Sequence, residues 1–299
     1  MRVSYCPDYY VPLPVGHPFP MAKFPELHRI LSAEGLIAAA DVVEPEEATW
    51  ELLGVVHTSD YLDCLRTGTL GREAERRLGL PWSAQLARRS RLAVRGTLNA
   101  AEMALEDGIA ANLAGGTHHA FAGHGEGFCV LNDVAVTVRH LTAMGRIRRS
   151  LVVDLDVHQG NGTATILADD PAAFTLSMHG ANNYPFRKTE SDLDLPLPDG
   201  TGDGAYLELL ASQLPALLER QRPDLVFYLA GVDVLEGDRY GRLSLTREGL
   251  RRRDRLVIAA AAERGTPMVV LMSGGYAPNA TDTADLHAIA HREARELLG

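Results

Sequence analysis

Three residues with metal-binding chemistry stand at alternate positions in this chain: Asp154, Asp156 and His158. They end an apolar run that is typical of a buried strand and that leads into a glycine-rich segment. Residues two apart in an extended strand point to the same face, so we expect these side chains to converge. Zinc accepts both carboxylate and imidazole ligands. The pattern therefore predicts a catalytic metal site with Asp156 and His158 as two ligands.

The segment Ala230-Gly-Val-Asp233 supplies a third candidate ligand. Asp233 follows the apolar run 225–230, where a single acidic residue could equally cap a helix or face solvent. The pair formed by Asp156 and His158 shifts the interpretation toward a metal ligand. Two carboxylates and one imidazole leave a coordination position open for water and substrate, which distinguishes a catalytic zinc from a structural one.

Tandem histidines, His118 and His119, follow two glycines after the apolar run 109–113. A loop loosened by glycine allows both imidazole rings to enter one pocket, which a regular strand would not. Imidazoles serve as general bases and acids at neutral pH. The alternatives are a surface loop and two further metal ligands. Asp154 could orient one of the rings through a carboxylate–imidazole hydrogen bond without itself binding a metal.

Two aromatic residues that directly follow a glycine could contact a substrate. Tyr276 ends Ser273-Gly-Gly-Tyr276, where its hydroxyl could point at a metal-bound carbonyl. One such donor to a developing oxyanion contributes roughly 3 to 4 kcal/mol. Considered alone, Tyr276 is better interpreted as a side chain packed over a loop. Phe128, which follows Gly127, fits a channel wall and an ordinary core position equally well.

Short apolar strands alternate with helix-like segments along the chain. We expect strands at residues 3–6, 109–113, 151–157, 173–178, 225–230 and 268–272, and helices at residues 24–34, 59–65, 84–104, 132–144, 204–220 and 246–264. This alternation predicts βαβ units and a doubly wound parallel sheet, in which ligands bind beyond the carboxyl ends of the strands. Residues 196–204 are expected to form a surface loop. No repeat or linker divides the chain, so one domain is expected over residues 1–299.

The overall composition narrows the classes of function. The 299 residues carry a formal net charge of −10, which argues against a nucleic-acid-binding surface but permits a basic protein tail or a cationic small molecule as substrate. No apolar run is long enough to span a membrane, and the N-terminus lacks the apolar core of a signal sequence. Three widely spaced cysteines fit free thiols in a reducing compartment. We therefore expect a cytoplasmic protein that binds neither nucleic acid nor membrane.

Other polar residues are expected to be structural or exposed. His57 is interpreted as structural, whereas His124, His140, His287 and His291 show no ligand spacing and are expected at the surface. The arginine-rich segment 247–255 is expected to be the solvated face of a helix.

Together these motifs resemble the zinc-dependent histone deacetylase family over most of the chain. The resemblance rests on Gly115-Gly-Thr-His-His-Ala120, Gly127-Phe-Cys-Val-Leu-Asn-Asp133, Val153-Asp-Leu-Asp-Val-His-Gln-Gly-Asn-Gly-Thr163, Ser177-Met-His-Gly180, Ala230-Gly-Val-Asp233 and Ser273-Gly-Gly-Tyr276. The short chain and its N-terminal segment are most similar to bacterial members near class IV. The resemblance implies a single-domain α/β fold of the arginase/deacetylase type, with a central eight-stranded parallel sheet and helices on both faces.

The resemblance also implies a role for each motif position. Zinc, or iron in the cell, would be held by Asp156, His158 and Asp233. The tandem histidines would work with Asp154 as the acidic partner of His118, and His119 is favoured as the base that activates water. The remaining implied roles are Tyr276 for polarising the scissile carbonyl, Phe128 and Tyr184 as opposite channel walls, and Gly127, Gly274 and Gly275 for substrate binding. A structural potassium ion would use main-chain oxygens of Asp154, Asp156, His158 and Met178, with the side chains of Asp154 and Ser177.

One position departs from part of the family. Asn161 stands where some members have an aspartate paired with the second tandem histidine. An amide cannot stabilise an imidazolium as a carboxylate does, so His119 should protonate less readily here. This favours His119 as a neutral general base at pH 7.

The reaction implied is hydrolysis of an N-acyl-lysine amide in a protein or a small acylated molecule. Three alternatives stay open: acetylpolyamine hydrolysis, a two-metal ureohydrolase of the same fold, and an acyl-binding module without catalysis. The ureohydrolase is disfavoured because Gly160, Gly231 and Leu235 stand where carboxylates for a second metal would be needed. The binding module is disfavoured because every catalytic position is filled.

Overall fold

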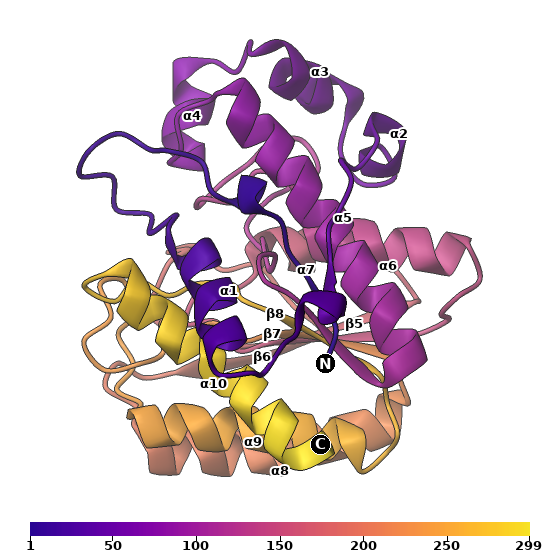
Figure 1. Ribbon diagram of the computed structural model, residues 1–299, viewed down its shortest axis with the longest axis vertical. Coiled ribbons are helices and arrows are strands. Elements are labelled where there is room, and N and C mark those ends of the chain that lie inside the picture. The colour runs from indigo at the N-terminus through magenta and orange to yellow at the C-terminus, as the bar shows by residue number, and fades with distance from the viewer.

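The apolar runs of the sequence form one parallel sheet in the computed structural model, which describes residues 1–299 (Figure 1). All strand pairs are parallel, and the order across the sheet is β2-β1-β3-β8-β7-β4-β5-β6. The strands are β1 Val3–Ser4, β2 Val42–Val43, β3 Ile109–Asn112, β4 Ser150–Asp154, β5 Ala173–Gly180, β6 Leu193–Leu197, β7 Leu225–Leu229 and β8 Met268–Leu271. The expected eight-stranded parallel α/β fold is confirmed.

Helices cover both faces of this sheet, because the central strands are apolar on both sides. On β4, Leu151 and Val153 pack into one hydrophobic cluster, whereas Val152 packs into the other. In Figure 1, α8 and α9 lie below the sheet, while α5 and α6 lie above it with α2, α3 and α4 beyond them. The helices are α1 Lys23–Ala33, α2 Trp50–Leu53, α3 Ser59–Thr67, α4 Arg72–Leu78, α5 Ala84–Asp107, α6 Asp133–Ala143, α7 Asn161–Leu167, α8 Asp203–Gln221, α9 Arg247–Ala262 and α10 Ala280–Leu298, with short 3-10 turns at Pro7–Tyr9 and Ala39–Asp41. No helix is both long and apolar enough to cross a membrane.

Two expected boundaries are wrong. Strand β4 ends at Asp154, so Asp156 and His158 belong to the loop that follows it and do not extend the strand. Their convergence therefore results from loop conformation and not from strand alternation. The expected surface loop at residues 196–204 is also wrong at its start, because Leu193–Leu197 forms the edge strand β6 beside β5.

The arginine-rich segment is not simply a solvated helix face, because Arg253 is fully buried. Its guanidinium forms an ion pair of 2.8 Å with Asp254, which also accepts a hydrogen bond from the Tyr228 hydroxyl. It donates further hydrogen bonds to the carbonyl oxygens of Gly231 at 2.6 Å and Leu155 at 3.4 Å. A polar network therefore occupies the interface between α9 and the sheet.

The expectation that His287 and His291 are exposed is wrong as well. Both side chains are buried on α10, a helix that the sequence pattern did not predict. Helix α10 packs against both α1 and α9, so its buried surface is wider than a single apolar stripe. His57 is buried as expected: Nε2 accepts a hydrogen bond from the backbone N–H of Asn132.

Buried neutral histidines should make the protein sensitive to acid. Burial lowers the pKa of His57 and of His291 to about 4, below the ordinary value of 6.5. The unfolded chain therefore binds more protons than the folded chain between pH 6.5 and 4. We predict that the free energy of unfolding falls as the pH is lowered from 6.5 to 4, by about 2–3 kcal/mol per histidine at most.

Urea unfolding at a series of pH values measures this slope. His291→Gln should reduce it, because the replacement cannot titrate and the His291 Nδ1 has no hydrogen-bond partner to lose. His140→Gln, on the half-exposed end of α6, is the matched control. If the free energy of unfolding changes equally with pH in the wild type and the His291→Gln protein, His291 does not cause the acid sensitivity.

Removing only the cation of the buried ion pair on α9 should lower the stability of the protein. Arg253→Met leaves the Asp254 carboxylate buried without its cation, and we predict a loss of about 3–5 kcal/mol in the free energy of unfolding. Arg252→Met changes an exposed neighbour on the same helix and should change stability by less than about 0.5 kcal/mol. Denaturant unfolding distinguishes the two, and equal stability of both variants would show that the network carries little energy.

Candidate active site

Asp156, His158 and Asp233 meet beyond the carboxyl ends of β4 and β7, which are neighbours in the sheet. All three side chains are buried, and their potential ligand atoms lie within 4.8 Å of one another. The Nδ1 of His158 lies 3.0 Å from Asp156 Oδ1 and 3.2 Å from Asp233 Oδ2. The three predicted ligands are therefore brought together, on loops that begin side by side.

This cluster has the properties of a cation site. Burial opposes charge on His158, but the carboxylates of Asp156 and Asp233 more than offset it and raise the histidine pKa to about 10. Burial and the charge of Asp156 raise the pKa of Asp233 to about 6. The Oδ2 atom of Asp233 is buried and accepts no hydrogen bond. Two carboxylates that draw positive charge, with one oxygen unsatisfied, fit a divalent metal such as zinc.

Hydrogen bonds from backbone N–H groups and one serine hydroxyl orient both carboxylates. Asp156 Oδ2 accepts from the N–H of Gly274 at 2.6 Å and from the hydroxyl of Ser273 at 2.7 Å. Asp233 Oδ1 accepts from the N–H of Val157 at 2.9 Å. One oxygen of each carboxylate is thereby occupied, and the other is directed at the imidazole of His158. Such supporting contacts hold ligands in place before a metal binds.

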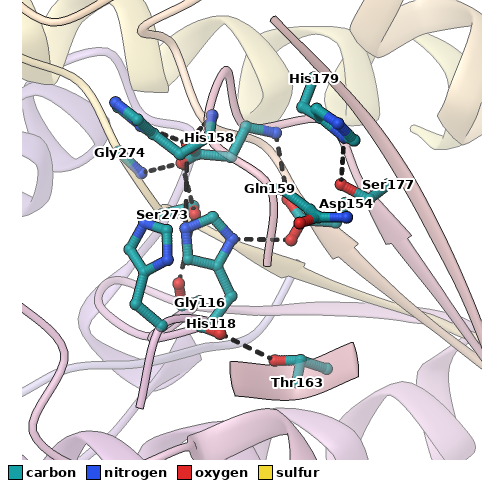
Figure 2. Close-up of polar contacts among 12 residues, drawn as sticks. Gly116, His118, Asp154, His158, Gln159, Thr163, Ser177, His179, Ser273 and Gly274 are labelled. Atoms are coloured by element: carbon teal, nitrogen blue, oxygen red, sulfur yellow. Dashed lines mark hydrogen bonds and ion pairs between the residues drawn. The ribbon is translucent and has the colours of Figure 1, made fainter. Parts of the chain in front are cut away.

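The tandem histidines lie next to this cluster, each with a different partner. His118 Nδ1 lies 2.7 Å from Asp154 Oδ2, an interaction that Figure 2 shows as a dashed line. His119 Nδ1 lies 2.6 Å from Asn161 Oδ1. Burial opposes protonation of His118, yet Asp154 and Asp156 raise its pKa to about 9. The expected Asp154–His118 pair is thus present in the structure.

His119 has the opposite electrostatic environment. Burial and the neighbouring charge of His118 hold the pKa of His119 well below 6.5. The amide oxygen of Asn161 can only accept a hydrogen bond, so neutral His119 carries its proton on Nδ1 and leaves the lone pair of Nε2 free. The two adjacent rings, with centroids 4.2 Å apart, therefore favour different protonation states.

Glu126 belongs to this site and was missed by the sequence interpretation. Its Oε1 accepts a hydrogen bond from Asn161 Nδ2 at 3.1 Å and another from the Tyr184 hydroxyl. Because Asn161 donates to Glu126, its amide oxygen must face His119. A glutamate in a glycine-rich loop carries no motif that would have identified it; only the fold brings it beside Asn161.

Aromatic side chains form the walls of a cavity of about 380 Å³ above the cluster. The rings of Phe128 and Tyr276 lie 6.0 Å apart, and Tyr184 lies 5.1 Å from His119 between centroids. Burial and the charge of Asp233 raise the pKa of Tyr276 well above its ordinary value, so its hydroxyl stays protonated. Phe128 has a left-handed backbone with φ 66°, a strained conformation for a residue with a side chain.

The three glycines predicted to bind substrate do not all line a cavity. Gly127 lines the same cavity as Phe128, and Gly274 lines a smaller one that the tandem histidines also line. Gly275 lines neither. The structure places Gly275 beside Val232 and His287.

The residues named for potassium also lie close together. Asp154 and Ser177 are register partners on β4 and β5, and Met178 follows Ser177 on β5. Figure 2 shows the Ser177 hydroxyl bonded to His179 Nδ1, at 3.0 Å. The potassium site stays a prediction.

Lys23 is a second residue that the sequence interpretation missed. Its side chain is buried, and its ammonium donates to the carbonyl oxygen of Ser273 at 2.9 Å. Burial lowers its pKa to about 8. The only signal in the sequence is that Lys23 is one of two lysines in an arginine-rich chain.

Comparisons with known proteins identify the family of this chain. The histone deacetylase domain family matches residues 17–291. An uncharacterized protein of Picosynechococcus is 49% identical over 295 residues, which cover 99% of this chain and 98% of that one. Histone deacetylase 2 of Arabidopsis thaliana is 35% identical over 269 residues, covering 87% and 70%.

A solved structure matches over a similar extent. The crystal structure of an HDAC homolog complexed with SAHA superposes with a TM-score of 0.81 at 27% identity, covering 99% of this chain and 88% of that one. The resemblance inferred from the motifs is confirmed, and homology supports a deacetylase, which is a hydrolase. The chain belongs to the histone deacetylase family.

Proposed function

We propose that this protein is a metal-dependent hydrolase that removes acetyl or other acyl groups from lysine side chains. One observation carries the proposal: a buried Asp–His–Asp cluster lies at the base of an aromatic-walled cavity, next to two histidines with different hydrogen-bond partners. This combination provides a cation site, a proton acceptor, a proton donor and a channel in one place.

Asp156, His158 and Asp233 would hold one zinc ion, with iron as the alternative in the cell. A bound metal of this kind acidifies water and polarises a carbonyl oxygen. The chain's own residues do the rest. Nε2 of His119 is free to accept a proton because Nδ1 donates to Asn161. His118, supported by Asp154, gives a proton to the departing lysine amine.

Tyr276 and the residues that line the cavity would contact the substrate. The Tyr276 hydroxyl, protonated because it is buried near carboxylates, donates a hydrogen bond to the carbonyl oxygen as negative charge develops there. Phe128 and Tyr184 line the cavity from different loops and would enclose the aliphatic stem of the lysine. The carbonyl of Gly127 would accept a hydrogen bond from the substrate amide.

The space around the cluster favours one metal over two. A carboxylate two residues after His158 would have to replace Gly160, where a β-carbon would lie only 2.5 Å from Asp154 Oδ2. No side chain fits there without displacing the partner of His118. This supports hydrolysis at a mononuclear centre and argues against a two-metal ureohydrolase.

The metal centre makes a direct prediction. Elemental analysis of the metal-loaded protein should find about one zinc or iron per chain, and bound metal should raise the unfolding temperature. Asp233→Asn should weaken metal binding by more than about tenfold in a chelator competition. Asp192→Asn, which changes a carboxylate bonded to Thr175 away from the site, is the control. Two manganese ions per chain, or unchanged affinity in Asp233→Asn, would contradict a mononuclear Asp–His–Asp centre.

Turnover is tested with a panel of acyl-lysine peptides, from acetyl to long-chain acyl, beside acetylated polyamines. We predict hydrolysis of at least one acyl-lysine peptide by the metal-loaded protein. Tyr276→Phe should keep its metal and lose about 10²–10³ in kcat, the value of one oxyanion donor. The proposal fails if no acyl-lysine peptide is hydrolysed, and the role of Tyr276 fails if its variant turns over normally.

A further inference from the structure

Arginine side chains stand at the mouth of the cavity that leads to the candidate metal centre. Arg76 and Arg77, on α4, line the cavity of about 380 Å³ whose other lining residues include His119 and His158. Arg76 also lines an adjoining open groove of about 720 Å³, together with Arg72 and Glu75, whose Oε1 accepts a hydrogen bond from the backbone N–H of Trp82. All three arginines are exposed. A substrate in this cavity would lie close to the side chains of Arg76 and Arg77.

Backbone hydrogen bonds hold α4 to the channel wall. The N–H of Gly127 donates to the carbonyl oxygen of Arg77 at 3.2 Å, and the N–H of Phe128 donates to that of Leu78 at 2.7 Å. Phe128 is one of the aromatic walls of the cavity. The arginines at the end of α4 are thus fixed beside the route to the site by the same contacts that place the Phe128 ring.

The positive charges at this mouth are nearly uncompensated. Arg77 has one weak partner, Glu73, at 3.7 Å, and Arg76 forms no ion pair. Arg187 and Arg239 are exposed next to the lining residues Phe186 and Tyr240, and neither forms an ion pair. We call these four arginines, Arg76, Arg77, Arg187 and Arg239, the basic mouth.

The nearby carboxylates are already engaged. Glu126 accepts hydrogen bonds from Asn161 and from Tyr184 on one oxygen, and His124 lies 3.4 Å from the other. Asp238 accepts from the backbone N–H groups of Tyr240, Gly241 and Tyr276. The residues that line the cavity include two arginines and no carboxylate, although the whole chain carries −10.

We propose that the basic mouth selects acyl-lysine in an acidic sequence context. Carboxylates flanking the acyl-lysine would meet the exposed guanidinium groups, and the adjoining groove of Arg72 and Arg76 would accommodate the continuing peptide. Lysine-rich tails and polyamines, which carry positive charge near the acyl group, would be repelled by the same arginines. This inference rests on the proposed acyl-lysine hydrolysis and specifies its substrate class.

Two matched peptides test the inference on the metal-loaded protein. Both carry the same central acetyl-lysine, one flanked by Asp and Glu and the other by Lys and Arg, and an acetylated polyamine is measured beside them. We expect kcat/KM for the acidic peptide to exceed that of the basic peptide by about tenfold at low ionic strength, from two or three rim ion pairs. The preference should shrink as salt is added, because exposed charges are screened.

Variants assign the preference to these arginines. The double variant Arg76→Glu/Arg77→Glu should reverse the order of the two peptides, whereas Arg252→Glu, an exposed arginine on α9, should preserve it. Equal kcat/KM for the two peptides in the wild type, a preference for the basic peptide or the polyamine, or an unchanged ratio in the double variant would overturn the inference.

A binding measurement tests this inference independently of the proposed hydrolysis. Fluorescence anisotropy is measured with the same peptide pair after replacement of the scissile amide nitrogen by a methylene group, which blocks hydrolysis. Tighter binding of the acidic member supports the basic mouth even where no peptide is turned over, a result that would defeat only the hydrolase proposal. Turnover of both peptides with equal binding would defeat only the charge selection.

Discussion

The candidate site is organised around two carboxylates that are buried against one imidazole. Carboxylate oxygens of Asp156 and Asp233 lie 3.0 and 3.2 Å from the same His158 nitrogen, and all three side chains are buried. Buried like charges are unfavourable unless a cation or hydrogen-bond donors compensate them. Donors from Gly274, Ser273 and Val157 compensate one oxygen of each carboxylate, and the remaining demand for positive charge is what a metal would meet.

The sheet and its glycines make this arrangement possible. Strands β4, β7 and β8 are adjacent, so the loops that follow them deliver their residues to one point. Gly274 must approach closely, since a β-carbon there would lie 1.9 Å from Asp233 Oδ2. Arg253 bonds the carbonyl oxygens of Leu155 and Gly231, which directly precede the two ligand-bearing turns. The buried network on α9 thus links the backbone of both loops from below.

Much of this was predictable from sequence, because continuous apolar runs and polar residues at their ends are local signals. The parallel sheet, the Asp–His–Asp cluster and the Asp154–His118 pair followed from such signals or from the resemblance they carried. The end of β4 was not predictable, because Leu155 and Val157 are apolar and extend the strand pattern although the chain turns after Asp154.

Residues whose roles depend on distant contacts could not be found in this way. Glu126 acquires a partner only when the fold brings Asn161 and Tyr184 to it. Arg253 resembles its exposed neighbours in sequence but faces the sheet, and the histidines of α10 are buried because two other helices pack on that helix. The left-handed backbone of Phe128, whose N–H donates to the Leu78 carbonyl at the end of α4, is likewise not indicated by its residue type.

In the proposed centre, two carboxylates and one imidazole hold one metal ion. X-ray absorption at the metal edge of the loaded protein measures this coordination. We predict that the metal is surrounded by nitrogen and oxygen atoms at about 2.0–2.2 Å, with the outer-shell pattern of a single imidazole. A sulfur ligand, the pattern of more than one imidazole, or a second metal at about 3.5–4 Å would contradict it.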